Sequence, residues 1–412
     1  MAPSLNVPLL TAGMLTTGVC MSLWSKYQDM QCVENCNDPN PHNRVFYEQP
    51  VWQTLQMFCG EMLCFIPVAY TWLMSSLRPP IQLPSEPEDD TSGSLKPSGQ
   101  RLRGWKVLLL FLPACCDLAG TTLVNVGLLL TPVSIFQMTR GALVLFVGVF
   151  SVIFLRRRLG LYQWFALVTV MAGVSVVGLS GLLAEKKMKE DSLLGHAVAF
   201  LTEPDAGPDA TQQATKVLTG VFFILSAQIF TATQFVIEEK IMTHYSVEPL
   251  VVVGLEGLFG AIIIMILFPI LSLPSVSSTT PYFDLPRGWH QMIGNSRVML
   301  SGVIIAFSIG GFNFFGLSVT RRVNATARSV TDACRTLAIW IVSLGLGWER
   351  LLWPVSVVQV AGFALLMWVT RFLFNDLVRG PPCIPRSRSV PASTDQAAAH
   401  LTETHDEAAL SA

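Results

Sequence analysis

The chain has 412 residues, of which 51% are apolar and 13% are charged, and its formal net charge is −1. Soluble globular domains carry about 25% charged residues, whereas the mean hydropathy of this chain is +0.50. The composition therefore excludes a soluble enzyme domain and indicates a helical protein that crosses a membrane several times. The small net charge says little about partners, and we expect no nucleic acid among them.

Ten stretches of the chain are long and apolar enough to span a membrane, since a spanning helix needs about 20 mostly apolar residues. Prolines and short polar runs separate neighbouring stretches and set their boundaries. These stretches predict an all-α membrane protein with ten transmembrane helices. The expected spans cover residues 5–25, 49–76, 105–129, 132–155, 160–182, 217–238, 248–273, 298–319, 324–347 and 352–374.

Three polar segments interrupt or follow these spans. Residues 78–104 and the tail 376–412 are rich in Pro, Ser and charge and lack apolar periodicity, which predicts disorder. The polar segment 184–216 has one stretch, LLGHAVAFL, that suits a short surface helix. We therefore divide the chain into a first five-helix repeat (1–183), an inter-repeat loop (184–216), a second five-helix repeat (217–375) and the tail.

A weak internal repeat supports this division. Ser151 in the fourth span and Ser343 in the ninth are 192 residues apart, and each precedes a charged turn, while Glu61 and Glu256 are 195 residues apart. Because five is odd, the second copy must enter the membrane from the opposite side. Inverted repeats are a recurrent transporter architecture with the substrate site near the midplane, although a chance similarity between two sets of spans is the alternative.

The distribution of basic residues predicts the orientation. With both termini in the cytosol, the cytosolic segments carry fifteen Lys and Arg residues and the opposite segments carry nine. This excess favours cytosolic termini by the positive-inside rule, although Lys26, just after the first span, argues locally for the reverse.

The ninth span contains charged residues where lipid-facing side chains are expected. Arg328, Asp332 and Arg335 fall at i, i+4 and i+7, on one helical face. Charged groups at a helix centre cost about 2.5–3.5 kcal/mol to insert, so they face the bundle interior and are candidates for function. Asp332 cannot neutralise both arginines, so one guanidinium needs another partner. The candidates are an anionic ligand, Asp117, Glu61 and Glu256, and the alternative is an ion-pair network that only locks the bundle.

Arg140 in the fourth span shares a face with Gln137, and the repeat places it opposite the arginines of the ninth span. Arginine suits planar anions such as carboxylate and phosphate. We therefore expect these arginines to converge on one anion-binding cavity. The alternative is a structural ion pair between Arg140 and Asp117.

Carboxyl groups in other spans are candidates for coupling or gating. Glu61 follows a glycine, and Glu256 lies in GLEGLFG, whose glycines at a spacing of three predict close helix approach. Both carboxyls are either neutral packing groups or protonatable groups, and Asp117 has the same ambiguity. No His lies in any expected span to complete a proton relay.

The first loop contains Cys32 and Cys36. If this loop faces an oxidising lumen, a local disulfide is possible, whereas a metal site with His42 is not expected. We find no phosphate-binding loop, zinc-protease motif or nucleophile elbow, and we expect no cofactor and no resident metal.

Six runs of the chain stand out: CCDLAGTTL, SIFQMTRGALVLFVGVFSVIFLRRRLGLYQW, QFVIEEK, GLEGLFG, NFFGLSVTRRVNATARSVTDACRT and SLGLGWE. Together they resemble solute carrier family 35, subfamily F, a relative of the nucleotide-sugar transporters in the drug/metabolite transporter superfamily. The resemblance covers about residues 5–375. It implies ten spans, two inverted halves and alternating access in an endomembrane (Golgi, endoplasmic reticulum or lysosome), but it leaves the cargo open.

These observations predict a secondary transporter for a small, anionic metabolite, with a coupling proton or counter-substrate as a possible second partner. A membrane scaffold that uses the same charges as structural pairs is the alternative, and no enzymatic activity is expected. Glu61, Asp117 and Glu256 are assigned to coupling or gating. The expected substrate-binding residues are Asn125, Gln137, Arg140, Asn313, Arg328, Asp332 and Arg335.

Overall fold

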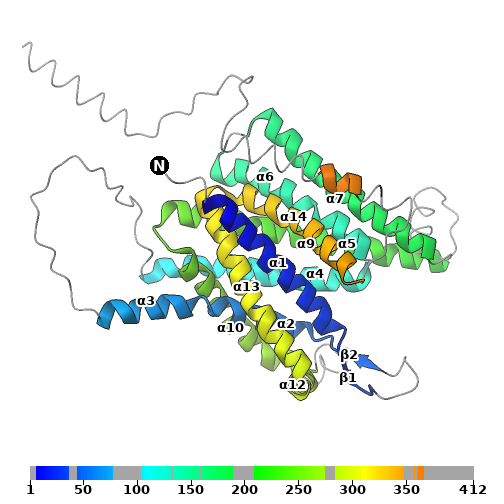
Figure 1. Ribbon diagram of the computed structural model, residues 1–412, viewed down its shortest axis with the longest axis horizontal. Helices are drawn as coiled ribbons and strands as arrows, with labels where there is room; N and C mark the ends of the chain where they lie inside the picture. The colour runs from blue at the N-terminus through cyan, green and yellow to red at the C-terminus, as the bar shows by residue number, and fades with distance from the viewer. Residues whose placement is uncertain are drawn as a thin grey trace, which may run out of the picture. The chain divides into compact units, whose positions relative to one another are not determined.

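The computed structural model describes residues 6–36, 44–77, 102, 104–131, 133–157, 159–188, 208–273, 284–347, 357 and 360–365. These residues fall within one compact unit, Met1–Thr370. The described part is all-α apart from one short hairpin (Figure 1). In chain order the elements are α1 (Asn6–Asp29), β1 (Cys32–Glu34), β2 (Val45–Phe46), α2 (Pro50–Met62), α3 (Phe65–Leu77), the 3-10 helix η2 (Gly104–Leu110), α4 (Phe111–Leu130), α5 (Val133–Arg140), α6 (Ala142–Leu155), α7 (Leu161–Met188), α9 (Pro208–His244), α10 (Pro249–Leu271), α12 (Leu285–Gly294), α13 (Ser296–Arg322) and α14 (Ala325–Gly345).

Six helical segments in the described part are long and apolar enough to cross a membrane, and two shorter apolar helices accompany them. The prediction of an all-α membrane protein is confirmed at this level. The six segments are Val7–Asp29, Pro50–Leu77, Gly104–Leu128, Thr215–His244, Pro249–Leu271 and Ser296–Arg322.

Two expected spans are interrupted. The second breaks between α2 and α3 at residues 63–64, because Pro67 lacks the N–H that would bond to the carbonyl of Leu63. The fourth breaks at Gly141, between α5 and α6, where glycine disfavours a continuous helix.

Other expected boundaries differ as well. Helix α7 continues to Met188 and α9 begins at Pro208, so helix occupies both ends of the expected loop 184–216. A proline at the first helical position is favourable, and this start carries α9 beyond the apolar region into PDATQQATK. Residues 189–207 and the tail 376–412 lie outside the described residues, as does most of the expected tenth span and of the segment 78–104.

The helices pair in a regular pattern. The most extensive contacts in the described part join α4 to α9 and α1 to α13. Helix α2 packs between α10 and α13, while α14 contacts α1 and α6. Figure 1 shows α1, α13 and α14 side by side. The three residues of the ninth span therefore lie inside the bundle, on a helix with neighbours from both halves of the chain.

Glycines allow α2 to approach its two neighbours closely. A Cβ atom added to Gly60 would collide with the carbonyl oxygen of Ala306 in α13 and lie 2.8 Å from the Cα atom of that residue. A Cβ atom on Gly257 of α10 would lie 2.6 Å from Cβ of Glu61 and 2.7 Å from the carbonyl oxygen of Phe58. The expected close approach at GLEGLFG is confirmed, and it leaves little free space around Glu61.

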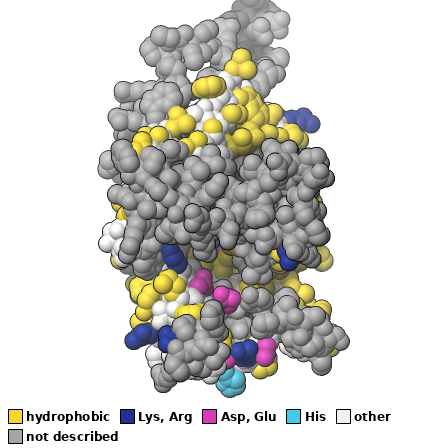
Figure 2. All heavy atoms as spheres, turned by 90° about the vertical axis from the view of Figure 1, so that its right-hand side faces the viewer, with side chains coloured by type: hydrophobic (Ala, Val, Ile, Leu, Met, Phe, Trp, Pro, Cys, Tyr) yellow, Lys and Arg dark blue, Asp and Glu magenta, His cyan; other side chains and the backbone are white. Residues whose placement is uncertain are grey.

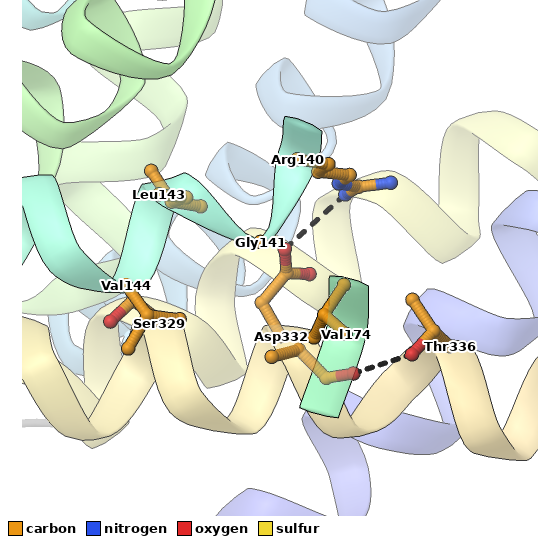
Figure 3. Close-up of a pocket in the computed structure, with 9 residues that line it drawn as sticks. Arg140, Gly141, Leu143, Val144, Val174, Ser329, Asp332 and Thr336 are labelled. Carbon is orange, nitrogen blue, oxygen red and sulfur yellow. Dashed lines mark hydrogen bonds and ion pairs between the residues drawn. The ribbon is translucent and has the colours of Figure 1, made fainter. Parts of the chain in front are cut away.

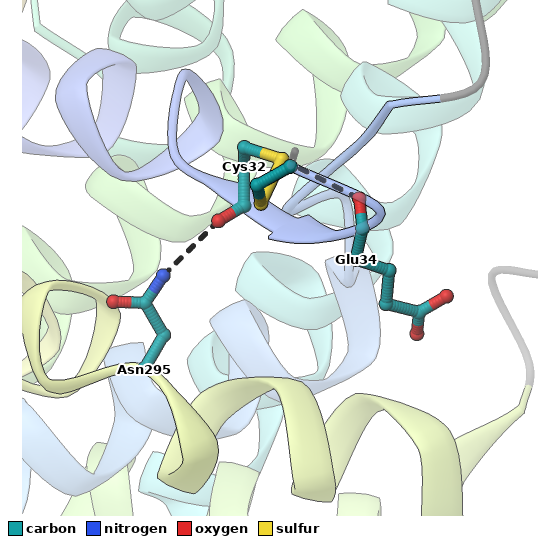
Figure 4. The surroundings of a disulfide bond; sticks show 4 residues. Cys32, Glu34 and Asn295 are labelled. Carbon is teal, nitrogen blue, oxygen red and sulfur yellow. Dashed lines mark hydrogen bonds between the residues drawn. A yellow bond between two sulfur atoms is a disulfide. The ribbon is translucent and has the colours of Figure 1, made fainter. Parts of the chain in front are cut away.

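A short hairpin with a disulfide at its first strand covers one end of the bundle. Cys32 and Cys36 form a disulfide, and Nδ2 of Asn295 donates to the carbonyl oxygen of Cys32 at 3.1 Å (Figure 4). Glu34 of the hairpin accepts from Nε of Arg287 at 2.8 Å and from Nε2 of Gln291 at 2.7 Å. These hydrogen bonds lower the pKa of Glu34 to about 2. The loop after α1 is thereby fixed to α12 and to the start of α13.

Figure 2 shows the distribution of charge on one face of the molecule. Most of the charged side chains that it shows lie in its lower half, towards the end that holds the hairpin and α12 in Figure 1, and hydrophobic side chains lie both beside them and at the upper end.

The contact at Gly60 predicts a large cost for a single methyl group. Gly60→Ala would place Cβ against the backbone of α13, which cannot move without separating the helices. We expect it to lower the free energy of unfolding by about 1–3 kcal/mol, measured as a lower melting temperature in detergent. Gly294→Ala is the control, because a Cβ atom at Gly294 would have no other atom within 4 Å. Equal melting temperatures for both variants would contradict the close approach.

Candidate functional site

Helix α14 carries three charged side chains into the bundle interior. It begins at Asn324, whose side chain accepts from the N–H of Ala327 at 2.7 Å and so caps the helix. Arg328, Asp332 and Arg335 are 1%, 7% and 2% exposed. Since buried charges are stable only with partners, the partners of these three residues define the candidate site.

Asp332 bridges two arginines from different helices. Its Oδ2 accepts from Nη2 of Arg140 on α5 at 3.2 Å (Figure 3). Its Oδ1 lies 3.0 Å from Nη2 of Arg335. The guanidinium of Arg335 also lies 4.9 Å from the ring centroid of Phe312. We call Arg140, Asp332 and Arg335 the arginine trio. With all three ionised, the trio has a net charge of +1.

The arginine trio contains hydrogen-bond donors that the described residues leave without an acceptor. Nε and Nη1 of Arg335 are buried without a hydrogen-bond acceptor among the residues that the structure describes. Arg140 keeps 30% of its side chain exposed, so its remaining donors are accessible. Nitrogen atoms of a buried guanidinium that lack an acceptor can donate hydrogen bonds to the oxygens of an anion.

A small cavity adjoins the arginine trio (Figure 3). Its volume is about 10 Å³, enough for about one water molecule. In this conformation a metabolite would need the cavity to widen. The lining residues are Arg140, Gly141, Leu143, Val144, Val174, Ser329, Asp332, Ala333 and Thr336.

Arg328 belongs to a second group of side chains. Its Nη1 donates to Glu238 of α9, and its Nη2 donates to Oδ1 of Asn313 at 3.3 Å. The guanidinium also stacks on Phe235, 3.9 Å from the ring centroid. Asn313 in turn donates through Nδ2 to Oε1 of Glu61 at 2.6 Å. Arg328 therefore pairs with Glu238, which was not among its expected partners.

Two further carboxyl groups complete this group. Glu256 on α10 lies within hydrogen-bonding reach of Glu238, and Asp117 on α4 interacts electrostatically with Glu61 and Glu238. We call Glu61, Asp117, Glu238, Glu256 and Arg328 the acidic cluster. Its members come from five helices, and it carries four carboxyl groups around one guanidinium.

The expected substrate-binding residues divide between these two groups. Arg140 pairs with Asp332 and not with Asp117, which was the structural alternative. Arg328 and Asn313 lie with the acidic residues. Asn125 lies on α4, and no hydrogen bond among the described residues joins it to either group. The side chain of Gln137 lies outside the described part.

Sequence reasoning missed Glu238 and Glu239. The expected sixth span ended at residue 238, whereas α9 continues to His244 and buries both carboxylates. Glu239 pairs with Arg157 and accepts from the N–H of Ala325 at 2.8 Å, at the N-terminus of α14. The apolar residues Ile241 and Met242 beyond the two glutamates were a signal that the helix stays in contact with the protein interior.

Comparisons with known proteins point to one family. A family model described as nucleotide-sugar transporter matches residues 103–305. The chain is 36% identical over 390 residues to "Solute carrier family 35 member F6" of Pongo abelii and 34% identical to that of Homo sapiens, with 90% of this chain and 89% of each relative covered. An uncharacterized protein of Schizosaccharomyces pombe is 32% identical over 90% of this chain and 98% of its own length.

One solved crystal structure shares the fold. It superposes with a TM-score of 0.51 at 13% sequence identity and covers 89% of this chain and 98% of the other. At this identity the likeness concerns the fold alone.

The geometry of the arginine trio predicts the effect of removing its carboxylate. Asp332→Asn leaves two guanidinium groups without a counter-charge, and breaking a buried ion pair in this way costs about 3–5 kcal/mol. We expect a lower melting temperature in detergent. Asp284→Asn is the control, because asparagine can still cap α12 in place of Asp284. An unchanged melting temperature for Asp332→Asn would show that the arginine trio is not paired.

Proposed function

The chain belongs to solute carrier family 35, within the nucleotide-sugar transporter family, and we propose that it is a secondary transporter that moves a small anionic metabolite across an endomembrane by alternating access. The family is one of multi-pass membrane transporters that are not enzymes, and its members carry small molecules. The anionic character of the cargo and the mechanism are inferences from the site.

The observation that carries the proposal is the net positive charge of the arginine trio. One carboxylate is shared by two guanidinium groups, and the more buried of them has two nitrogen atoms without an acceptor among the described residues. The oxygens of a carboxylate or phosphate would accept hydrogen bonds from these nitrogen atoms, and the negative charge would cancel the excess positive charge. Either group is present in many small metabolites, so the arginine trio indicates the charge of the cargo but not which metabolite it is.

We further propose two inverted five-helix repeats. If the first five spans correspond in order to the last five, the contact between α4 and α9 is equivalent to the contact between α13 and α1. These are the two most extensive helix contacts in the described part. Arg140 and Asp332, which pair, are 192 residues apart, the same separation as Ser151 and Ser343.

This symmetry supports the assignment of the site. Residues that are equivalent in two repeats can touch each other only near the axis that relates the repeats. Arg140 and Asp332 do so, and Glu61 and Glu256 interact electrostatically. In transporters with inverted repeats, the substrate site lies at the repeat interface near the membrane midplane. The arginine trio and the acidic cluster both occupy such an interface in this proposal.

The same proposal places both termini in the cytosol. The hairpin that follows α1 contains the disulfide between Cys32 and Cys36, and disulfides persist in oxidising compartments such as the lumen of the secretory pathway. A luminal hairpin after the first span puts the N-terminus in the cytosol, and an even number of spans puts the C-terminus there too.

Arg140 provides the test of anion transport. In proteoliposomes assayed with a panel of labelled anionic metabolites, Arg140→Lys should reduce uptake about tenfold or more, because an ammonium keeps the charge but not the planar pair of donors. The variant should still fold, since the lysine can pair with Asp332. Arg321→Lys, at an exposed position at the end of α13, is the control and should transport normally.

Normal uptake by Arg140→Lys would remove Arg140 from the binding site. A protein that transports no member of the panel, and in which Arg140→Ala only lowers the melting temperature, would favour the scaffold alternative.

Epitope tags provide the test of orientation. Tags on both termini should bind antibody after the plasma membrane alone is permeabilised, because both ends then face the cytosol while the organelles remain closed. A tag inserted next to the hairpin, at residue 44, should bind only after the organelle membranes are opened. Protection of a terminal tag in intact organelles would contradict the proposed orientation.

A further inference from the structure

The acidic cluster is not needed to bind an anion, and its charges do not balance. Its four carboxyl groups come from α2, α4, α9 and α10, and they surround the guanidinium of Arg328 on α14. Arg328 is the cation that acts on all four of them. The neutral groups that face them are Asn313 of α13 and Gln234 of α9. Four ionised carboxylates with one guanidinium would carry a net charge of −3.

A net charge of −3 is not stable among side chains that are shielded from water. Glu61, Glu238 and Glu256 are 2%, 0% and 5% exposed. Uncompensated charges in a low-dielectric interior cost several kcal/mol each. The cluster therefore requires a positively charged ligand.

The packing restricts what that ligand can be. The glycine contacts around Glu61 bring backbone and side-chain atoms too close for a methyl group, so no hydrated cation fits there. The described residues also contain no group of three or more His, Cys, Asp and Glu side chains that could hold a metal ion. A proton needs no space of its own.

The hydrogen bonds show which carboxyl groups lack a donor. Glu238 receives its donor from Arg328, and Glu61 receives one from Asn313 on Oε1. Oε2 of Glu61 and Oε1 of Glu256 are buried without a partner among the described residues, and so is Oε1 of Glu238. Since Glu238 and Glu256 lie within hydrogen-bonding reach, a proton on one supplies the missing donor to the other.

We propose that the acidic cluster is a proton-binding site in which Glu61 and Glu256 are carboxylic acids and Glu238 is the ionised partner of Arg328. The two protons change the net charge of the cluster from −3 to −1, and the remaining charge lies on Asp117, the least buried of the four carboxyl groups. Each carboxylate takes its proton from the aqueous compartment to which the site opens and returns it as the acid ionises. Arg328 and Asn313 are then positioning residues of this site and do not contact the cargo.

Helix α14 links the proton site to the arginine trio, since Arg328 lies one turn from Asp332. An anion at the trio adds negative charge near the cluster, and opposite charges attract, so bound anion and bound protons favour each other. The expected mode is therefore cotransport of protons with the anion. This mode of coupling rests on the proposed anion transport, whereas the proton site does not.

Infrared spectroscopy tests the proton site without a substrate. Near neutral pH, purified protein should show the carbonyl-stretch band of protonated carboxylic acids, and Glu61→Gln and Glu256→Gln should each remove one component of it. Glu248→Gln is the matched control, because Glu248 is exposed at the start of α10, the helix that carries Glu256. An absent band, or one that both cluster variants leave unchanged, would overturn the proposal.

Melting temperatures provide a second, independent measurement. Glutamine matches a protonated glutamate in size and retains a donor, so Glu61→Gln and Glu256→Gln should melt within about a degree or two of wild type, as expected for changes of less than about 0.5 kcal/mol. Glu238→Gln should melt several degrees lower, because it leaves Arg328 unpaired. Equal losses for all three variants would show that all three groups are ionised and would overturn the proposal.

Coupling is then tested in proteoliposomes with whichever labelled anion is taken up. An inwardly directed proton gradient should accelerate wild-type uptake, and Glu61→Gln and Glu256→Gln should lose this acceleration. Unaccelerated wild-type uptake would overturn coupling but leave the infrared result standing. Lack of any anion uptake would instead contradict the proposed function, so the two failures are distinguishable.

Discussion

Ionic groups inside a membrane bundle require partners in the protein, and this requirement governs the interior of the molecule. Water cannot compensate a guanidinium or a carboxylate there, so each buried charge must be matched by another side chain or by a ligand. Two of the three charges on α14, Asp332 and Arg328, are matched by residues from α5 and α9, and Arg335 shares Asp332 on α14 itself. The position of α14 therefore depends on charge pairs with both halves of the chain as well as on apolar packing.

Because these pairs join different helices, they resist independent movement of the helices that they connect. The ion pair of Glu239 with Arg157 adds a further connection, at the N-terminus of α14. A transport cycle would have to rearrange such pairs in a defined order. Helix α14 carries residues of both the arginine trio and the acidic cluster, so its movement would link a change in one group to a change in the other.

Much of this arrangement was predictable from local features of the sequence. Apolar stretches predicted the long helices, and the glycines of GLEGLFG predicted a close helix contact that the structure contains. The spacing of Arg328, Asp332 and Arg335 predicted a shared interior face. Each of these predictions depends on residues within one helix, where the periodicity of the chain fixes the geometry.

The pairing of the charges was not predictable in the same way. The sequence suggested three other carboxylates as partners for the unpaired arginine but not Glu238. Glu238 begins the charged run at which the apolar stretch, and with it the expected span, ends. The partner of Arg140 depends on how α5 meets α14, which is a tertiary property. The break before Pro67 was available to sequence analysis, since a proline within an apolar stretch interrupts backbone hydrogen bonding.

The hydrogen bonds that hold the hairpin depend on pH differently from the carboxyl groups in the interior of the bundle. Because the pKa of Glu34 is lowered to about 2, its hydrogen bonds with Arg287 and Gln291 contribute stability above the usual glutamate pKa and lose it only as the pH falls towards 2. Organelle lumens range from neutral to moderately acidic, well above that value. The hairpin therefore holds α12 equally firmly over that whole pH range, so any effect of moderate acidity on the molecule arises from groups other than Glu34.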